Sequence, residues 1–256
     1  MISSKIKTHL KKMEQKKFRK EFLEFTIEGI KGVEEALKSD FDIALILIQA
    51  NKRDDEDILK IINKANKKNI EIEYVGIKDL ESISSTKTFP GVLAIVSQKE
   101  FYLDNFLKSD NIIILDKIND PGNLGTIIRT ADWFGIDKII LSEDSVDIYN
   151  PKTIRSTMGS IFHIDILQVN NLEKVLDKFK QEKFIINAFT LNGEKIDNIS
   201  KNKVNKNIFL FGSESHGLRS ELEKKVDRSY TITGYGQAES LNLAISAGII
   251  MNKIKN

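Results

Sequence analysis

Apolar residues in the first half of the chain occur in short uninterrupted runs, separated by stretches in which they recur at helical spacing. Short runs of this kind indicate buried strands, and a period of about 3.6 residues indicates a helix that buries one face. The runs lie at 41–48, 70–75 and 92–96, and the helical spacing lies at 55–68. This order predicts a small α/β unit.

The second half repeats one arrangement three times: an apolar run, a polar or glycine-rich loop, and then helical spacing. The runs lie at 112–115, 208–211 and 230–232, and the helices are predicted at 126–134, 218–226 and 240–253. Loops that follow the carboxyl ends of strands in an α/β sheet meet at one crevice. We therefore expect these three loops to form one site.

A chain of 256 residues can hold two domains. We place the first at 1–105 and the second at 106–256. The stretch 99–109 has no clear period and is predicted to join them.

Composition narrows the chemistry. The chain has no cysteine and three scattered histidines, so we expect neither a disulfide framework nor a metal centre, and hence a metal-free mechanism. It has no signal-peptide core and no apolar run long enough to cross a bilayer, so we expect a soluble, cytoplasmic protein without a membrane partner. The formal net charge of +2 gives no strong overall attraction to nucleic acid.

A local concentration of basic residues lies near the N-terminus. These residues are Lys5, Lys7, Lys11, Lys12, Lys16, Lys17, Arg19 and Lys20, opposed within that stretch only by Glu14. They can form a solvated helix face or a surface that contacts phosphates. Composition alone favours the solvated face, because lysine is abundant throughout the chain.

The first of the three loops spans 120–125 and precedes Arg129. Pro121 and Gly122 predict a turn, and a helix after it would let the Arg129 guanidinium return to the loop, so that Asn123 and Arg129 face one crevice. The structural alternatives are a turn role for Asn123 and an exposed or salt-bridged role for Arg129. Trp133 has apolar neighbours, which favours a place in the core over a base-stacking role.

The second loop runs from Gly212 to Gly217 and carries Glu214 between the two glycines. It lacks the lysine of a nucleotide P-loop and the spacing of a dinucleotide fingerprint, which argues against ATP hydrolysis and NAD chemistry. Ser215 and His216 are disfavoured as nucleophile and base. Adjacent side chains are expected to point apart, and no third group is evident to orient the histidine.

The third loop, 239–242, opens the last predicted helix. Ser240 is a candidate N-cap for this helix. Asn242 lies in the first predicted turn, where side chains can line the crevice.

Together these motifs resemble those of the SpoU (TrmH-type) ribose 2′-O-methyltransferase family of the SPOUT superfamily. The family's first motif, an asparagine with an arginine downstream, matches Asn123 and Arg129. Its second motif, Gly-x-Glu-x-x-Gly, matches Gly212, Glu214 and Gly217. Its third motif, Ser-Leu-Asn, matches Ser240, Leu241 and Asn242. The segment 25–29 and the βαβ pattern after it resemble the family's L30e-like substrate-binding domain. Taken alone, Glu28 in that segment could be a helix-terminal residue beside a glycine turn.

The resemblance implies an α/β protein with a C-terminal, trefoil-knotted, parallel-sheet methyltransferase domain and a smaller N-terminal L30e-like domain. It implies S-adenosylmethionine as methyl donor, RNA as substrate with ribosomal RNA the leading class, and a homodimer with its site near the subunit interface. The implied catalytic residues are Arg129, Asn123, Glu214, Ser240 and Asn242, and the implied cofactor-binding positions are Gly212, Ile232 and Leu241.

Two neighbouring positions depart from the family pattern. Thr233 and Gly234 replace the usual proline and methionine after Ile232, and a looser loop there would weaken cofactor binding. Two alternatives therefore stay open: a methyltransferase that acts on transfer RNA, and an RNA-binding protein that kept the fold and lost turnover.

Overall fold

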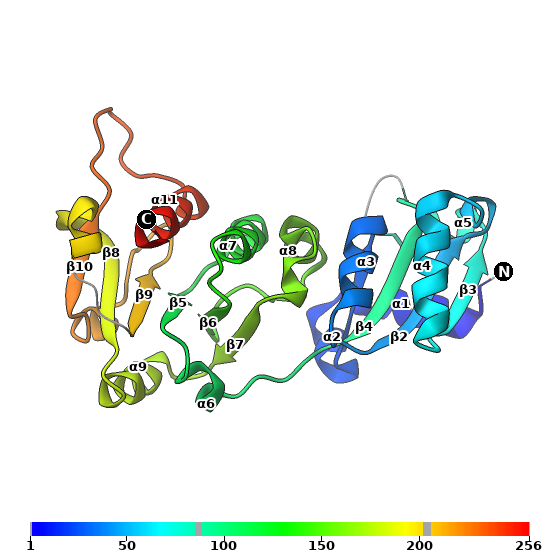
Figure 1. Ribbon diagram of the computed structural model, residues 1–256, viewed down its shortest axis with the longest axis horizontal. Helices are drawn as coiled ribbons and strands as arrows, with labels where there is room; N and C mark the ends of the chain where they lie inside the picture. The colour runs from blue at the N-terminus through cyan, green and yellow to red at the C-terminus, as the bar shows by residue number, and fades with distance from the viewer. Residues whose placement is uncertain (1, 85–88, 202–205, 256) are drawn as a thin grey trace. The chain divides into compact units, whose positions relative to one another are not determined.

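The computed structural model contains two β-sheets, one in each of two compact units (Figure 1). It describes residues 2–84, 89–201 and 206–255. The first unit joins Met1–Lys99 with Asp147–His163, and the second joins Glu100–Val146 with Ile164–Asn256. The predicted α/β class is confirmed.

The first unit is built on a four-stranded sheet in the order β1-β4-β2-β3, in which β4 runs antiparallel to both of its neighbours. Its strands are β1 (Glu24–Glu28), β2 (Ile43–Gln49), β3 (Ile72–Val75) and β4 (Val92–Ser97). Its helices are α1 (Ser4–Met13), α2 (Lys16–Phe22), α3 (Ile30–Lys38), η1 (Ala50–Lys52), α4 (Glu56–Lys67), α5 (Ile77–Glu81), α8 (Pro151–Thr157) and η2 (Ser160–Phe162).

Helix α1 covers one face of this sheet because its apolar residues recur on one side. Leu10 and Met13 are buried in a cluster with Leu45 and Leu47 of β2. The alternate strand residues Ile46 and Ile48 point to the opposite face. Helices α3 and α4 lie side by side on the other side of the sheet from α1 (Figure 1).

The second unit is built on a six-stranded, parallel sheet in the order β10-β8-β9-β5-β6-β7. The strands are β5 (Asn111–Leu115), β6 (Lys138–Ser142), β7 (Asp165–Val169), β8 (Ile185–Lys195), β9 (Asn207–Phe211) and β10 (Arg228–Thr231). The helices are α6 (Leu103–Phe106), α7 (Pro121–Trp133), α9 (Leu172–Gln181), η3 (Ile196–Lys201), α10 (Ser220–Glu223) and α11 (Leu243–Lys255). Buried side chains of α6, α9 and α10 pack with alternate residues of β5, β8 and β9 on one face of the sheet. Helices α7 and α11 pack together on the other face. Among the described residues, no helix has the length and apolar character needed to span a bilayer.

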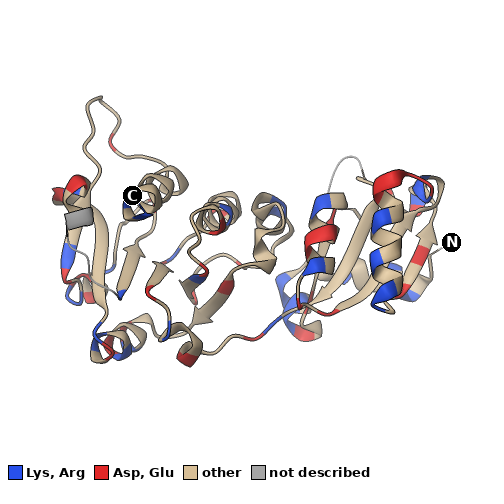
Figure 2. Ribbon diagram, in the orientation of Figure 1, with Lys and Arg blue, Asp and Glu red and all other residues tan. Residues whose placement is uncertain are grey.

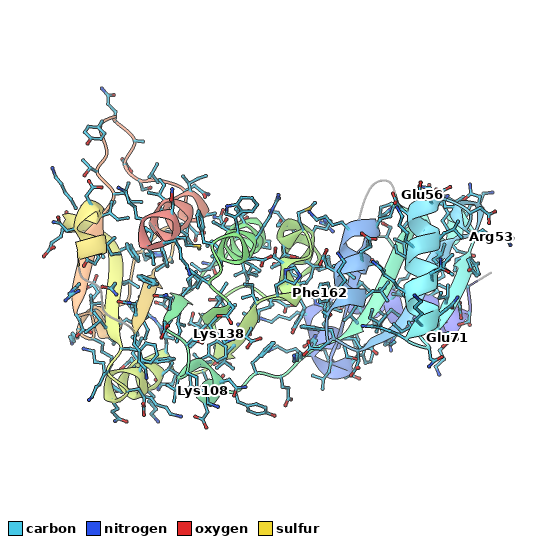
Figure 3. All side chains as sticks on the ribbon, in the orientation of Figure 1. Arg53, Glu56, Glu71, Lys108, Lys138 and Phe162 are labelled. Atoms are coloured by element: carbon cyan, nitrogen blue, oxygen red, sulfur yellow. The ribbon has the colours of Figure 1, made fainter. Side chains whose placement is uncertain are left out.

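The segment Asp147–His163 packs within the first unit although 47 residues of the second unit precede it in the chain. Its Tyr149 ring stacks on Phe25 of β1, with ring centroids 4.7 Å apart. Phe162, labelled in Figure 3, meets Phe41 edge to face at 5.2 Å. These aromatic contacts tie a late segment of the sequence to an early strand.

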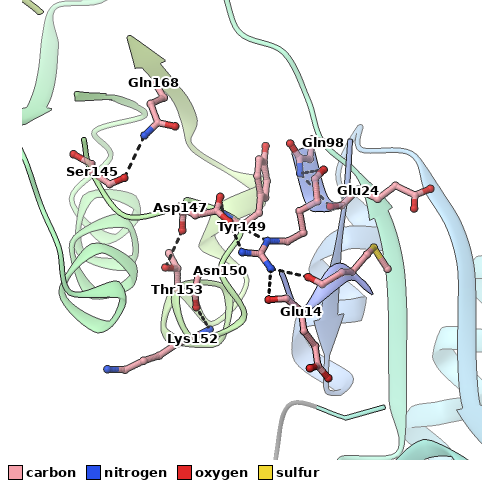
Figure 4. A network of polar contacts seen from close by, with 12 residues as sticks. Glu14, Glu24, Gln98, Ser145, Asp147, Tyr149, Asn150, Lys152, Thr153 and Gln168 are labelled. Carbon is pink, nitrogen blue, oxygen red and sulfur yellow. Dashed lines mark hydrogen bonds and ion pairs between the residues drawn. The ribbon is translucent and has the colours of Figure 1, made fainter. Parts of the chain in front are cut away.

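A buried ion pair adds to these contacts. The Arg19 side chain is 4% exposed, and its Nε donates to Asp147 Oδ2 over 2.9 Å (Figure 4). Arg19 Nη1 donates to the carbonyl oxygens of Met13 and Glu14. A buried charge is tolerated only when its hydrogen bonds are satisfied, so this network fixes the α1–α2 turn against the late segment.

Burial of Tyr149 leads to a prediction about alkaline stability. Burial, with a smaller contribution from Asp147, raises the pKa of Tyr149 to about 12, against an opposing hydrogen bond with the Lys99 backbone. A raised pKa contributes stability that is complete below the unfolded value of about 10 and is lost as pH rises through the folded value. Tyr149→Phe should remove this loss, which amounts to up to about 3 kcal/mol.

The measurement is the free energy of unfolding from urea titrations between about pH 9 and pH 12. Tyr74→Phe, which changes a half-exposed tyrosine of β3, is the matched control and should keep the wild-type profile. Parallel profiles for wild type and Tyr149→Phe would contradict the prediction.

Helix α7 corrects two predictions. Residues 121–125, predicted as a turn, form its first helical turn, because Pro121 occupies the first helical position and Asp120 caps the helix. Trp133, predicted in the core, is 85% exposed. It lies about 200° around the helix from the buried Ala131, so it faces away from the sheet.

Candidate functional site

The site is positioned by strands β5, β9 and β10, which run parallel in one sheet and end at the same edge. The loops after them carry the three sequence motifs. Because parallel strands direct their carboxyl ends to one crevice, this edge is where the loops can meet.

Asn123 is held at the start of α7. Asp120 Oδ1 accepts a hydrogen bond of 2.7 Å from the Asn123 backbone N–H, which satisfies one of the free donors at the helix start. This cap fixes the first turn of α7. The Asn123 side chain is therefore presented from a rigid element.

Asn242 is the N-cap of α11. Its Oδ1 accepts from the N–H groups of Ala244 and Ile245, at 2.9 and 3.2 Å. The helix accordingly begins at Leu243, and the expectation that Ser240 caps it is wrong. Ser240 lies two residues before the cap and is exposed.

A relay of side-chain amides joins the three motif loops. Asn242 Nδ2 donates to Asn123 Oδ1 over 3.0 Å, and Asn123 Nδ2 donates to Glu214 Oε1 over 2.8 Å. We call this chain the Asn242–Asn123–Glu214 relay. Three residues separated by 91 and 119 positions in sequence are thus brought together.

The direction of the relay follows from the cap. Asn242 Oδ1 must accept from backbone N–H groups, so its Nδ2 is left to donate to Asn123. Asn123 therefore receives at Oδ1 and donates at Nδ2, which suits the acceptor-only carboxylate of Glu214. No hydrogen bond reaches the second oxygen of Glu214 from the part of the chain that the structure describes, which leaves this oxygen open to a ligand.

The loop that carries Glu214 is a tight closed turn. Ser213 and Gly217 exchange two backbone hydrogen bonds of 3.0 Å each. Gly212 is buried against this turn, since a Cβ placed on it would lie 2.2 Å from the carbonyl carbon of Gly217. Only glycine fits there, which explains the first glycine of the motif.

Ser215 and His216 correct one expectation. Ser215 Oγ lies 2.7 Å from His216 Nδ1, so the two side chains hydrogen-bond and do not point apart. Both are exposed. In the described residues, no carboxylate pairs with His216 to orient it, and the pair lacks the third member of a nucleophilic triad.

An ion pair that the sequence motifs do not include secures the same loop. Arg219 donates from Nε and Nη2 to the two oxygens of Asp116, at 3.0 and 2.6 Å. Asp116 is 1% exposed at the end of β5, and its hydrogen bond raises the pKa of Arg219. The signal in the sequence is a charged residue that directly follows an apolar strand. The pair fastens the loop after β9 to the end of β5 and so steadies Glu214.

Arg129 stands apart from the relay. It lies six residues after Asn123 in α7, which places it about 120° away around the helix. Its side chain is exposed, and it forms no hydrogen bond or ion pair with the residues that the structure describes. The structure thus brings Asn123, Glu214 and Asn242 together but not Arg129.

The segment between β10 and α11 has an open backbone. Residues 233–241 are exposed, and within the described chain their backbone groups bond to no other backbone group. No atom lies within 4 Å of a Cβ placed on Gly234 or Gly236. Leu241 is 50% exposed and Ile232 is half-buried, so apolar side chains flank free backbone donors and acceptors.

Two family models match the chain. The model described as the SpoU rRNA Methylase family matches residues 110–252. The model described as RNA 2′-O ribose methyltransferase substrate binding matches residues 26–102.

Similar proteins of known name or structure cover nearly the whole chain. A 23S rRNA (guanosine(2553)-2′-O)-methyltransferase of Bacillus subtilis is 32% identical over 96% of this chain and 94% of its own length. A 23S rRNA (guanosine-2′-O-)-methyltransferase of Acinetobacter baylyi is 29% identical over 87% of this chain and 93% of its own. The crystal structure of an AdoMet-bound rRNA methyltransferase from Sinorhizobium meliloti superposes with a TM-score of 0.87 at 29% identity, covering 100% of this chain and 95% of that one.

Proposed function

This chain belongs to the SpoU rRNA methylase family, and we propose that it transfers a methyl group from S-adenosylmethionine to a ribose 2′-hydroxyl of RNA. Ribosomal RNA is the proposed substrate class. Two relatives that share most of their length with this chain are named as 23S rRNA methyltransferases. The observation that carries the proposal is the Asn242–Asn123–Glu214 relay, which unites the three family motifs at one edge of the sheet.

The residues present fit S-adenosylmethionine. The exposed backbone of 233–241 offers donors and acceptors for the edge of an adenine ring, and Ile232 and Leu241 offer apolar contacts. Gly212 keeps the neighbouring turn closed without a side chain. We assign cofactor binding to Gly212, Ile232 and Leu241. The cofactor supplies an electrophilic methyl group on a positively charged sulfur.

The protein's own contribution is to position the acceptor hydroxyl. A ribose hydroxyl is a weak nucleophile, and transfer requires the oxygen, the methyl carbon and the sulfur in line, so orientation supplies much of the rate. Arg129 would hold the hydroxyl and its neighbouring phosphate. A guanidinium group offers donors and no acceptor, so the role proposed for this residue is positioning and not that of a simple base.

The relay would shape the other side of the site. Asn123 fixes one oxygen of Glu214, which leaves the second oxygen to accept a hydrogen bond from the ribose or the cofactor. Ser240 is exposed beside Leu241 and would contribute a hydroxyl to the bound RNA or cofactor. Rigid placement by two helix caps is what a positioning mechanism requires.

The test is methyl transfer from labelled S-adenosylmethionine to total RNA from cells that lack this protein. The expected result is label in a 2′-O-methylated nucleoside of one large ribosomal RNA. Label in transfer RNA would refute ribosomal RNA as the substrate and would still support methyl transfer to a ribose 2′-hydroxyl. A folded protein that binds RNA and fails to bind S-adenosylmethionine would favour the binding-protein alternative.

We also propose that the protein is a homodimer. Ile245 and Ile249 lie four residues apart on one face of α11 and are exposed, and Trp133 is exposed at the end of the adjacent α7. An apolar face of this kind is typical of a subunit interface. Arg129 is not joined to the relay of its own chain. Pairing through this face would let a second subunit contribute to the site and complete it.

Ile245→Glu should therefore shift the protein from dimer to monomer, because a carboxylate would be buried in the interface. Sedimentation or light scattering measures the mass. Leu59→Glu, at a half-exposed leucine of α4, is the matched control and should leave the mass unchanged. A monomeric wild type would refute the dimer proposal.

Three further expectations remain predictions: the domain boundary at 105/106, the trefoil knot and the cytoplasmic location.

A further inference from the structure

The two N-terminal helices form an open groove with a volume of about 690 Å³. Its lining includes Lys5, Ile6, Thr8, His9, Lys12 and Phe22, and we call it the α1–α2 groove. It lies entirely within the first unit, and none of the three family motifs contributes to it.

Helix α1 divides its residues between the core and this groove. Leu10 and Met13 are buried against the sheet. Lys5, His9 and Lys12 recur at intervals of four and three residues, which places them on one face of the helix. Lys5 and Lys12 are two turns, or about 10 Å, apart along that face. The groove therefore has an apolar middle with an ammonium group toward each end.

The middle of the groove is an aromatic stack. The His9 and Phe22 rings are stacked with centroids 4.5 Å apart, and Phe18 continues the stack at 5.9 Å from Phe22. Glu24 Oε2 lies 2.6 Å from His9 Nε2. Because an ionised carboxylate only accepts, this nitrogen is the donor, and the bond holds the His9 ring in its stacking orientation.

The charge around the groove is strongly positive. Six lysines of α1 and α2 are exposed: Lys5, Lys11, Lys12, Lys16, Lys17 and Lys20. The Nζ atoms of Lys12 and Lys17 lie 5.2 and 5.7 Å from the Phe18 ring centroid. Elsewhere in this unit, Lys and Arg segments alternate with Asp and Glu segments along the helices (Figure 2). Aromatic rings interleaved with lysines are the arrangement that single-stranded nucleic acid binds, with bases on the rings and phosphates on the cations.

We propose that the α1–α2 groove binds one unpaired nucleobase of the RNA substrate, stacked on the His9–Phe22 pair, with flanking phosphates on Lys5 and Lys12. The proposal rests on the proposed function and adds a second point of RNA binding outside the methyl-transfer site. RNA is favoured over an acidic membrane, because two of the three large apolar residues of α1, Leu10 and Met13, are buried and unavailable for insertion, which leaves only the half-buried Ile6.

The experiment measures binding of the full-length protein to a labelled single-stranded RNA oligonucleotide and to the same oligonucleotide with abasic sites. Wild type should bind the intact strand about tenfold more tightly, because an abasic strand has no bases to stack on the rings. Phe22→Leu keeps apolar volume in the core and removes the ring, so it should abolish this preference. Phe22→Tyr should restore it.

The phosphate-binding role of the two lysines is tested by Lys5→Gln with Lys12→Gln. This double variant should weaken binding to both strands and lower the salt slope by about 0.7 for each phosphate that is no longer neutralised. The matched control is Lys60→Gln with Lys67→Gln on α4, also seven residues apart and outside the groove, which should bind as wild type does.

Methyl transfer separates this inference from the proposed function. Groove variants should raise KM for ribosomal RNA and leave kcat unchanged. If wild type transfers methyl groups and the groove variants bind RNA as wild type does, the proposal that the groove binds a nucleobase is refuted and the proposed function stands. An absence of methyl transfer by wild type would overturn the function, while the oligonucleotide comparison would still decide the groove. If the groove variants lose binding to acidic phospholipid vesicles and bind RNA as wild type does, the groove is a membrane-binding surface and the proposal is refuted.

Discussion

Arg129→Ala is expected to lower kcat/KM for methyl transfer by about a hundredfold or more, with no loss of stability. The Arg129 side chain is exposed and forms no hydrogen bond or ion pair with the described residues, so its removal leaves no buried group without a partner. Its proposed task is to hold the acceptor hydroxyl and the phosphate in line, and small errors in such positioning cost about two orders of magnitude in rate.

The matching measurements are steady-state methyl transfer and the free energy of unfolding. Arg129→Lys keeps the charge but removes the planar, two-pronged donor, so its activity should lie between wild type and alanine. Arg53→Ala, an exposed arginine after η1, is the control and should methylate as wild type does. Wild-type transfer by Arg129→Ala would remove this residue from the site.

The sequence predicted that the three motif loops meet at one edge of the sheet, because each motif comes after an apolar strand. It could not predict how the loops bond to one another. The hydrogen bond between Asn123 and Glu214 spans 91 residues, and its direction depends on a cap made by Asn242. The local rule that serine caps helices pointed to Ser240, and the longer-range packing of α11 selected Asn242 instead.

Local sequence patterns also failed to predict Arg19, which hydrogen-bonds both to its own helical region and to a segment far away in the sequence. Arg19 was expected to be one more basic residue of a solvated helix, yet it is buried against Asp147, 128 positions away. The segment that contains Asp147 lies inside the match to the SpoU rRNA Methylase family but packs in the first unit. Hydrophobic periodicity shows which face of an element is buried but not which segment packs on that face. Neither the Arg19–Asp147 ion pair nor the packing of this segment could therefore be predicted from the sequence.

Trp133 is the opposite case: local sequence predicts that it is buried, and the structure exposes it. Its neighbours in sequence are apolar, and average behaviour places tryptophan in a core. The helix turns it outward because Leu124, Ile127, Ile128 and Ala131 already define the buried face of α7. The exposure of Trp133 on α7, like that of Ile245 and Ile249 on α11, supports the homodimer proposed above.

Gly212→Ala should be the most damaging single change in the motif loops. The added methyl would lie 2.2 Å from the Gly217 carbonyl carbon and 2.4 Å from the Leu218 nitrogen, and backbone atoms cannot rotate away as a side chain can. The closed turn would have to open, breaking the two hydrogen bonds between Ser213 and Gly217. Overpacking of this kind costs about 3 kcal/mol of stability.

The damage should spread from Gly212 to the chemistry through Glu214. When the turn opens, Glu214 leaves Asn123 Nδ2, and the relay is broken at its Glu214 end. Urea titration gives the stability, amide hydrogen exchange over 207–218 reports the turn, and calorimetry reports S-adenosylmethionine binding. Gly234→Ala is the control, because its methyl meets no atom within 4 Å, and it should keep both stability and exchange at wild-type values. If Gly212→Ala instead bound S-adenosylmethionine normally with wild-type exchange, the closed turn would not be what places Glu214. The contrast between two glycines of neighbouring loops thus separates a glycine required by close backbone packing from one that a side chain can replace.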